Sequence, residues 1–259
     1  MTAIDPGVTC IIENGILRIT IDRPSTMNAV RAESLEVIAD ALGRHSGDPG
    51  VRTVVLSGAG RAFCTGADLS AVDISDVPSA ESIEVANRTI SAIRTFPRPV
   101  IGAVRGPAAG VGVSLALACD LIVAAESSYF LLAFSRVGLM PDGGSTALVA
   151  ASVGRARAMA MALLAERLSA QEALRSGLIA QVYPDDDFAS HVDALARRLA
   201  SGPPTAFRKT KDAINDATLG QLDAAFEREL TGQLELFAGS DFAEGLDAFM
   251  NKRPARFVP

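Results

Sequence analysis

Apolar and polar residues alternate most clearly near the N-terminus, in residues 8–22. Every second residue in the latter half of this stretch is apolar, and Asn14-Gly15 interrupts the pattern with a dipeptide typical of tight hairpin turns. The stretch is therefore predicted to form a β-hairpin with one buried face. Residues 31–43 and 80–96 instead carry apolar residues at the spacing of amphipathic helices.

Short apolar runs bounded by glycine and proline predict buried strands in the first two-thirds of the chain. We expect these strands at residues 51–57, 100–105, 121–125 and 129–134. From residue 145 on, the chain is expected to be largely helical. A capping box at Ser169–Glu172, a short strand at 179–183 and helices near 187–200, 205–216, 220–237 and 241–251 are predicted there. This order predicts an α/β core with a helical C-terminal section.

Two glycine-rich loops, at residues 58–69 and 106–112, each follow a predicted buried strand. The second leads into Val113–Cys119, which is too apolar for a surface and is interpreted as a buried helix beginning near Gly110. The first N–H groups of a helix can bind a phosphate, a carboxylate or an oxygen that becomes negative during a reaction. One such loop alone can equally be a tight turn between strand and helix. The pattern lacks the third glycine of a dinucleotide fingerprint, and the absence of Gly-Lys-Ser/Thr excludes a P-loop.

Ser114 lies in Gly112-Val-Ser-Leu-Ala116, a sequence close to the nucleophile elbow of serine hydrolases. Asp142 and His191 follow it in the order of that triad. However, Ser114 falls inside an apolar run, and His191 lies in a polar segment that is expected to face solvent. We therefore favour Ser114 as a small packing residue over Ser114 as a nucleophile.

Asp142 lies in Pro141-Asp-Gly-Gly144, a string that is ordinarily a turn. The preceding residues are apolar, and an aspartate in apolar surroundings has a raised pKa and suits proton transfer. Near the C-terminus, Asn251-Lys-Arg253 and Arg256 form a basic tip, which is either a solvated helix end or a phosphate contact.

The 259 residues are 49% hydrophobic and 21% charged, as in soluble globular proteins, and suffice for one large domain or two small ones. A net charge of −6 argues against nucleic acid as a partner. The three cysteines are far apart, without metal-ligand spacing, and their odd number disfavours a disulfide framework. Because the cysteines lack metal-ligand spacing, we expect no metal site. The cysteine usage predicts a reduced, cytoplasmic location, and the N-terminus shows no signal-peptide pattern. No uncharged apolar run has the roughly 18 residues of a membrane span, so no membrane partner is expected.

Six segments taken together resemble the enoyl-CoA hydratase/isomerase (crotonase) family, and they occur in the family's order over nearly the whole chain. They are RPSTMNAV (23–30), GAGRAFCTGADL (58–69), RPVIGAVRGPAAGVGVSLALACDL (98–121), FSRVGLMPDGGS (134–145), LSAQEALRSGLIAQVYP (168–184) and EGLDAFMNKRPARF (244–257).

The resemblance implies a crotonase-like spiral of ββα units, with the acyl-CoA site in residues 1–195. It also implies a helical C-terminal region, residues 196–259, that assembles homotrimers, often as pairs of trimers. The ligand would be an acyl-CoA thioester, with no cofactor beyond the CoA carried by the substrate. Its carbonyl oxygen would accept hydrogen bonds from the backbone N–H groups of Ala67 and Val111. Residues implied to line the CoA are Met27, Ala29, Ala67, Asp68, Leu69 and, from a neighbouring subunit, Lys252.

Two departures from the family pattern bear on the reaction. Hydratases of this family use two glutamates, at positions that hold Ser114 and Phe134 here. The chain instead resembles the branch whose single acid lies in the Pro-Asp loop, which makes Asp142 the expected base of an enoyl-CoA isomerase. A 1,3-proton shift can use one carboxylate, whereas hydration needs two groups. A hydratase with atypical acids, a serine hydrolase using Ser114 and a non-catalytic acyl-CoA-binding protein remain as alternatives.

Overall fold

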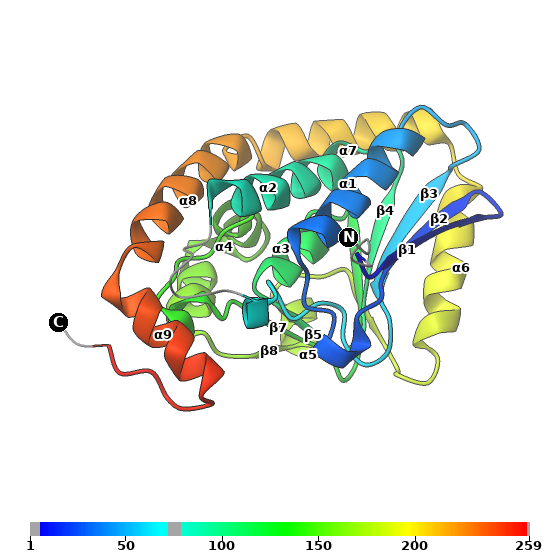
Figure 1. Cartoon of the computed structure of the whole chain (residues 1–259). Helices are drawn as coiled ribbons and strands as arrows, with labels where there is room; N and C mark the ends of the chain where they lie inside the picture. Colours follow the sequence, from blue (N-terminus) through cyan, green and yellow to red (C-terminus); the bar gives the residue numbers. More distant parts are fainter. Residues whose placement is uncertain (1–5, 72–78, 258–259) are drawn as a thin grey trace, which may run out of the picture.

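The computed structural model describes residues 6–71 and 79–257 of the chain. Within these residues, the larger sheet has six strands in the order β1-β2-β3-β4-β6-β9 (Figure 1). They are β1 (Val8–Glu13), β2 (Ile16–Ile21), β3 (Thr53–Gly58), β4 (Val100–Val104), β6 (Leu121–Ala125) and β9 (Gln181–Tyr183). The first two strands form the predicted antiparallel hairpin, and the other neighbours are parallel. β2 buries its apolar residues, whereas β1 is a largely exposed edge strand.

A smaller sheet in the described chain has the order β5-β7-β8. Its strands are β5 (Pro107–Ala109), β7 (Tyr129–Leu131) and β8 (Leu168–Ser169). The chain passes from β4 through β5 into helix α3 (Val111–Leu117), and from β6 through β7 into α4 (Ser145–Leu164). These repeated ββα units are the predicted spiral.

Two details of these strands differ from the sequence-based expectation. β5 was expected to be part of a glycine loop, but Pro107–Ala109 pairs with β7. The strand expected at 129–134 ends at Leu131 because its partners β5 and β8 are short, and a 3-10 helix, η3 (Phe134–Val137), follows it.

Helices cover both faces of the larger sheet. On one face, α1 (Ala32–His45), α2 (Ala80–Thr95) and α3 share the main hydrophobic core with residues such as Val54 and Val100. On the other face, α6 (Phe188–Ala200) packs Phe188 and Val192 against Val55 and other residues of the sheet. All seven residues of α3 are buried, which confirms the predicted buried helix after the second glycine loop.

The remaining helices are α5 (Ala170–Arg175), α7 (Pro204–Thr218), α8 (Leu222–Phe237) and α9 (Ser240–Met250). The capping box that starts α5 is present as predicted. Figure 1 shows α7, α8 and α9 following one another along the outer edge of the molecule, where α8 contacts α2 and α4. The expected boundary between residues 195 and 196 falls inside α6, so the peripheral helical region begins with α7.

α4 is the one helix of the described chain that is long and apolar enough to cross a membrane by length and composition. It carries Arg155 and Arg157, and its backbone leaves helical geometry at Gly154. Its start is buried, but Met159, Leu163 and Leu164 near its end are exposed. α4 is therefore an apolar helix that the rest of the chain covers only in part.

Candidate active site

The two glycine loops meet backbone to backbone. A Cβ added to Gly66 would lie 3.2 Å from the carbonyl oxygen of Ala109, and one added to Gly110 would lie 3.4 Å from the Cα of Gly66. Ala67, next to Gly66, forms an isolated parallel bridge with Val30, in which Val30 N–H donates to the carbonyl of Gly66 at 2.8 Å. The contact between Gly66 and Gly110 therefore places Ala67 close to the start of α3, and the bridge to Val30 fixes its backbone.

The backbone N–H groups of Ala67 and Val111 come from these two loops. The bridge bonds Val30 to the residues on either side of Ala67, so the N–H of Ala67 points away from Val30. Val111 is the first residue of α3, where an N–H has no intrahelical acceptor. Among the described residues, neither N–H donates a hydrogen bond. Two backbone donors are therefore available for an oxygen atom of a ligand.

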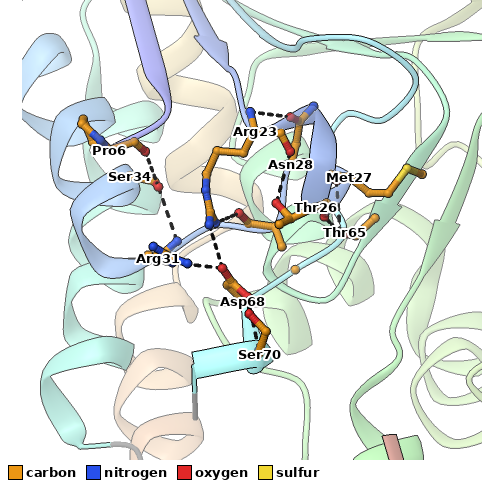
Figure 2. Close-up of polar contacts among 12 residues, drawn as sticks. Pro6, Arg23, Thr26, Met27, Asn28, Arg31, Ser34, Thr65, Asp68 and Ser70 are labelled. Atoms are coloured by element: carbon orange, nitrogen blue, oxygen red, sulfur yellow. Dashed lines mark hydrogen bonds and ion pairs between the residues drawn. The ribbon is translucent and has the colours of Figure 1, made fainter. Parts of the chain in front are cut away.

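Asp68, the residue after Ala67, is held by side chains of three other residues, as Figure 2 shows. Its Oδ2 accepts hydrogen bonds from Arg23 Nη2 at 2.8 Å and from Arg31 Nε at 3.0 Å, and Ser70 binds its other oxygen. Burial acts to raise the pKa of Asp68, but the bonds from Ser70, Arg23 and Arg31 together hold that pKa well below its ordinary value. The carboxylate is therefore occupied within the protein, and a role of Asp68 toward CoA stays a prediction.

Met27 and Asn28 lie close to Thr65 (Figure 2), and the carbonyl of Ala29 accepts a hydrogen bond from Arg23, which also binds Asp68. Met27 and Asn28 both adopt left-handed backbone conformations, and Thr65 Oγ1 donates to the carbonyl of Met27 at 3.1 Å. Asn28 is fully buried, and its amide donates to the carbonyls of Ala59 and Ala62. Asparagine tolerates this backbone conformation better than most residues, which is the signal in the sequence that could have pointed to Asn28.

The Pro-Asp loop rests on the first turns of α3. A Cβ added to Gly143 would lie 3.1 Å from Ser114 Oγ and 3.4 Å from Val111 Cγ2, and Gly143 has a φ of +61°. Ser114 Oγ donates to the backbone carbonyl of Asp142 at 3.0 Å. The structure thus packs the loop that carries Asp142 against Val111, the residue that supplies one of the two free donors.

Asp142 has the electrostatic setting of a proton carrier. The residue as a whole is half-buried, but burial of its carboxyl group raises the pKa of Asp142 to about 7. Gln233 Nε2, which donates to Asp142 Oδ2 at 2.8 Å, lowers that pKa, and the nearby carboxylate of Glu229 raises it. A carboxyl with a pKa near neutrality can both accept and return a proton.

Helix α8 supplies two polar side chains to this loop, Glu229 and Gln233, that the sequence analysis missed. Glu229 accepts hydrogen bonds from Gly144 N–H at 2.6 Å, from Thr146 N–H at 2.9 Å and from the Thr146 hydroxyl. Gln233 binds Asp142, and both α8 side chains are fully buried. They occupy the same buried face of α8 as Leu222, Phe226 and Phe237. Polar residues at apolar positions of an amphipathic helix are the signal that could have found them.

Ser114 is not part of a hydrolase triad. His191 lies on α6, on the opposite face of the larger sheet from α3, and stacks on Tyr183 with ring centroids 4.2 Å apart. The serine hydroxyl instead holds the Asp142 loop by its backbone. The serine hydrolase alternative is therefore wrong for this arrangement.

Ser114→Ala is expected to retain at least a tenth of the activity, because loss of one neutral hydrogen bond costs about 1 kcal/mol. Steady-state turnover and a fluorophosphonate probe test this. Covalent labelling of the wild-type protein at Ser114 would contradict the packing role.

Comparisons with known proteins show the family of this chain. The family model described as enoyl-CoA hydratase/isomerase matches residues 11–258. The chain belongs to the enoyl-CoA hydratase/isomerase family. It is 44% identical over 249 residues to a probable enoyl-CoA hydratase of Rhodobacter capsulatus, covering 95% of this chain and 96% of that protein. It is 38% identical over 252 residues to 1,2-epoxyphenylacetyl-CoA isomerase of Escherichia coli, with the same two coverages.

A solved structure shows the crotonase fold directly. A crystal structure described as an enoyl-CoA hydratase from Mycobacterium avium subsp. paratuberculosis superposes with a TM-score of 0.92 at 48% identity, covering 98% of this chain and 99% of that one. The predicted family and the predicted α/β crotonase fold are thus confirmed.

Both positions at which a hydratase of the enoyl-CoA hydratase/isomerase family is expected to carry glutamate lie beside the donors. Ser114 is one turn along α3 from Val111, and Phe134 Cζ lies 3.9 Å from a Cβ added to Gly110. Neither residue can take up a proton. The loop that carries Asp142 packs against Ser114 and Val111.

Two predicted CoA-lining residues lie apart from this cluster. Leu69 is half-buried and packs against a small apolar cluster that includes Phe242 of α9. Lys252 is exposed just beyond α9, at a surface cavity of about 530 Å³ whose lining includes Arg136, Phe249 and Phe257. The roles of both residues toward CoA stay predictions. Across residues 6–71 and 79–257, no group of three or more His, Cys, Asp or Glu side chains could hold a metal ion.

Proposed function

We propose that this chain is an enoyl-CoA double-bond isomerase with Asp142 as its single base. One observation carries the proposal: a carboxyl with a pKa of about 7 lies in the loop that packs on Val111, the residue that supplies a free backbone donor, and the two hydratase positions hold serine and phenylalanine. Asp142 removes a proton from C2 of a 3-enoyl thioester, and the electrons form a dienolate. The negative oxygen is stabilised by the N–H groups of Ala67 and Val111. Asp142 then returns the proton at C4, which leaves a 2-enoyl thioester.

The name of the Escherichia coli relative supports an isomerase, and that of the Rhodobacter capsulatus relative supports a hydratase with atypical acids. Hydration needs one group to activate water and another to protonate C2. Glu229 is the other buried carboxyl beside the loop, but it accepts three hydrogen bonds from Gly144 and Thr146. It is therefore poorly placed to activate water, and the isomerase is favoured.

The experiment that tests this proposal compares 3-enoyl-CoA and 2-enoyl-CoA substrates of equal chain length, with products identified by mass spectrometry. We expect conversion of the 3-enoyl to the 2-enoyl compound and only slow hydration. Rapid formation of a 3-hydroxyacyl-CoA with little double-bond migration would establish the hydratase instead.

The chain is also proposed to assemble as a homotrimer or a pair of trimers. The apolar end of α4 supports this, because Leu163 and Leu164 are 70% and 62% exposed in the single chain. Light scattering at micromolar concentration is expected to give three or six times the mass of the chain. A monomer mass for the wild type would contradict the proposal. Leu163→Asp is expected to shift the assembly toward monomers without loss of helical circular dichroism.

A further inference from the structure

α8 lies at the edge of the molecule, yet it places two fully buried polar side chains on the loop that carries Asp142. Glu229 and Gln233 are one helical turn apart and contact Gly144, Thr146, Met140 and Asp142. Burying an amide and a carboxyl costs free energy unless both groups form hydrogen bonds inside the protein. The hydrogen bonds of Glu229 and Gln233 therefore suggest that these side chains position the loop that carries Asp142.

The orientation of the Gln233 amide is set by a donor that cannot change. Its Oε1 accepts the backbone N–H of Met140 at 3.3 Å. A backbone N–H can only donate, so the other end of the amide, Nε2, must face Asp142. Nε2 can only donate as well, so Asp142 Oδ2 must accept and cannot carry a proton toward Gln233.

Asp142 Oδ1 accepts no hydrogen bond from any described residue. When Asp142 is protonated, the proton is therefore on Oδ1 rather than shared between its two oxygens. Glu229 helps to keep Asp142 Oδ1 free, because it accepts the hydrogen bonds of the Gly144 and Thr146 N–H groups at the start of α4. A carboxylate that accepted those donors itself would be a weaker base.

We propose that Gln233 is a positioning residue, whose amide fixes Oδ2 of Asp142 and leaves Oδ1 as the oxygen that carries the proton between C2 and C4. This inference rests on the isomerase function proposed above. It links the outer helix α8 to the chemistry of the loop through a contact between residues 91 positions apart.

The groups that face Asp142 define the expected pH dependence. From α8 they are Gln233, which lowers the pKa of Asp142, and Glu229, which raises it, with Arg228 acting on Glu229. α3 presents Val111 and Ser114, which do not ionise in this range. α9 meets the loop at Gly138 through the backbone of Asp241.

The test is the pH profile of kcat/KM for two variants. Gln233→Met is close in size but donates no hydrogen bond, and its acidic limb is expected to move up by about one pH unit. Gln233→Glu adds a like charge, and its shift is expected to be larger in the same direction. Gln221→Met is the matched control, because Gln221 is an exposed glutamine at the start of α8 without a side-chain cap bond, and its profile should match the wild type.

A second readout does not depend on activity. In protein labelled with ¹³C-aspartate, the carboxyl resonance that disappears in Asp142→Asn reports the pKa of Asp142 directly. We expect the order wild type, Gln233→Met, Gln233→Glu, from lowest to highest pKa. Titration curves that coincide in all three proteins would overturn the inference. If one variant does not fold, comparison of the other variant with the wild type still tests the inference. A wild type that fails to isomerise would instead refute the proposed function, and the resonance would still test Gln233.

Discussion

Asp142→Asn is expected to lose double-bond isomerisation by at least about 10²-fold while it still binds acyl-CoA. The substitution keeps the size of the side chain and an oxygen that can accept from Gln233 Nε2, but it cannot take up a proton. Positioned general bases contribute on the order of 10²–10⁴-fold in rate. Single-turnover isomerisation and calorimetric titration with a saturated acyl-CoA measure the two effects separately.

The pH dependence of the Tm of Asp142→Asn tests independently whether the pKa of Asp142 is raised in the folded protein. Burial raises the pKa of Asp142 to about 7 in the folded protein, so the folded state holds the proton more tightly than the unfolded state. Stability from this group is present at about pH 4 and is lost as the pH rises toward 7. Asparagine does not titrate, so the Tm of Asp142→Asn relative to that of the wild type should rise as the pH is raised from 5 to 8.

Asp186→Asn is the matched substitution, because Asp186 is an exposed aspartate outside the Asp142 loop. It should change neither isomerisation nor the pH dependence of Tm. Normal isomerisation by Asp142→Asn would remove Asp142 from the role of base and leave the family assignment intact.

Val111→Pro is expected to lower kcat by about 10²–10³-fold, because it deletes one of the two donors for the thioester oxygen. Val111 is the first residue of α3, a position where proline is well tolerated, and Gly110 before it places no Cβ against the ring. The fold should therefore survive. Turnover at saturating substrate, with circular dichroism to check the fold, measures the effect.

Val111→Gly is the matched control for the loss of the valine side chain. It keeps the N–H and should retain most of the activity, although glycine in a helix costs about 1 kcal/mol of stability. Val111→Pro with native circular dichroism and full activity would exclude this donor from the mechanism.

Local patterns predicted most of the fold. The Asn14-Gly15 turn, the apolar run of α3 and the capping box at Ser169 each report on neighbouring residues, and each is confirmed. β5 was missed because it is short and lies among glycines, so only its pairing with β7 identifies it. Pairing between distant segments leaves little trace in a single sequence.

In the site, too, local sequence identified some residues, and contacts between distant segments determine the others. Asp142 was identified by its apolar, proline-containing loop and by the family resemblance. Gln233 and Glu229 were treated as parts of a helix, because their contacts with Asp142 and Thr146 join residues more than 80 positions apart. The hydrogen bonds from Arg23 and Arg31 to Asp68 also join residues that are far apart in the sequence, so they could not be predicted from local patterns.

The central claim is that one carboxyl moves a proton from C2 to C4 inside the site. The most direct test uses a 3-enoyl-CoA with two deuterium atoms at C2, with the product of the first turnovers analysed by NMR. The account predicts a 2-enoyl-CoA in which part of the deuterium has moved to C4. A product with an oxygen at C3, or one whose C4 acquires only solvent hydrogen from the first turnover, would contradict it.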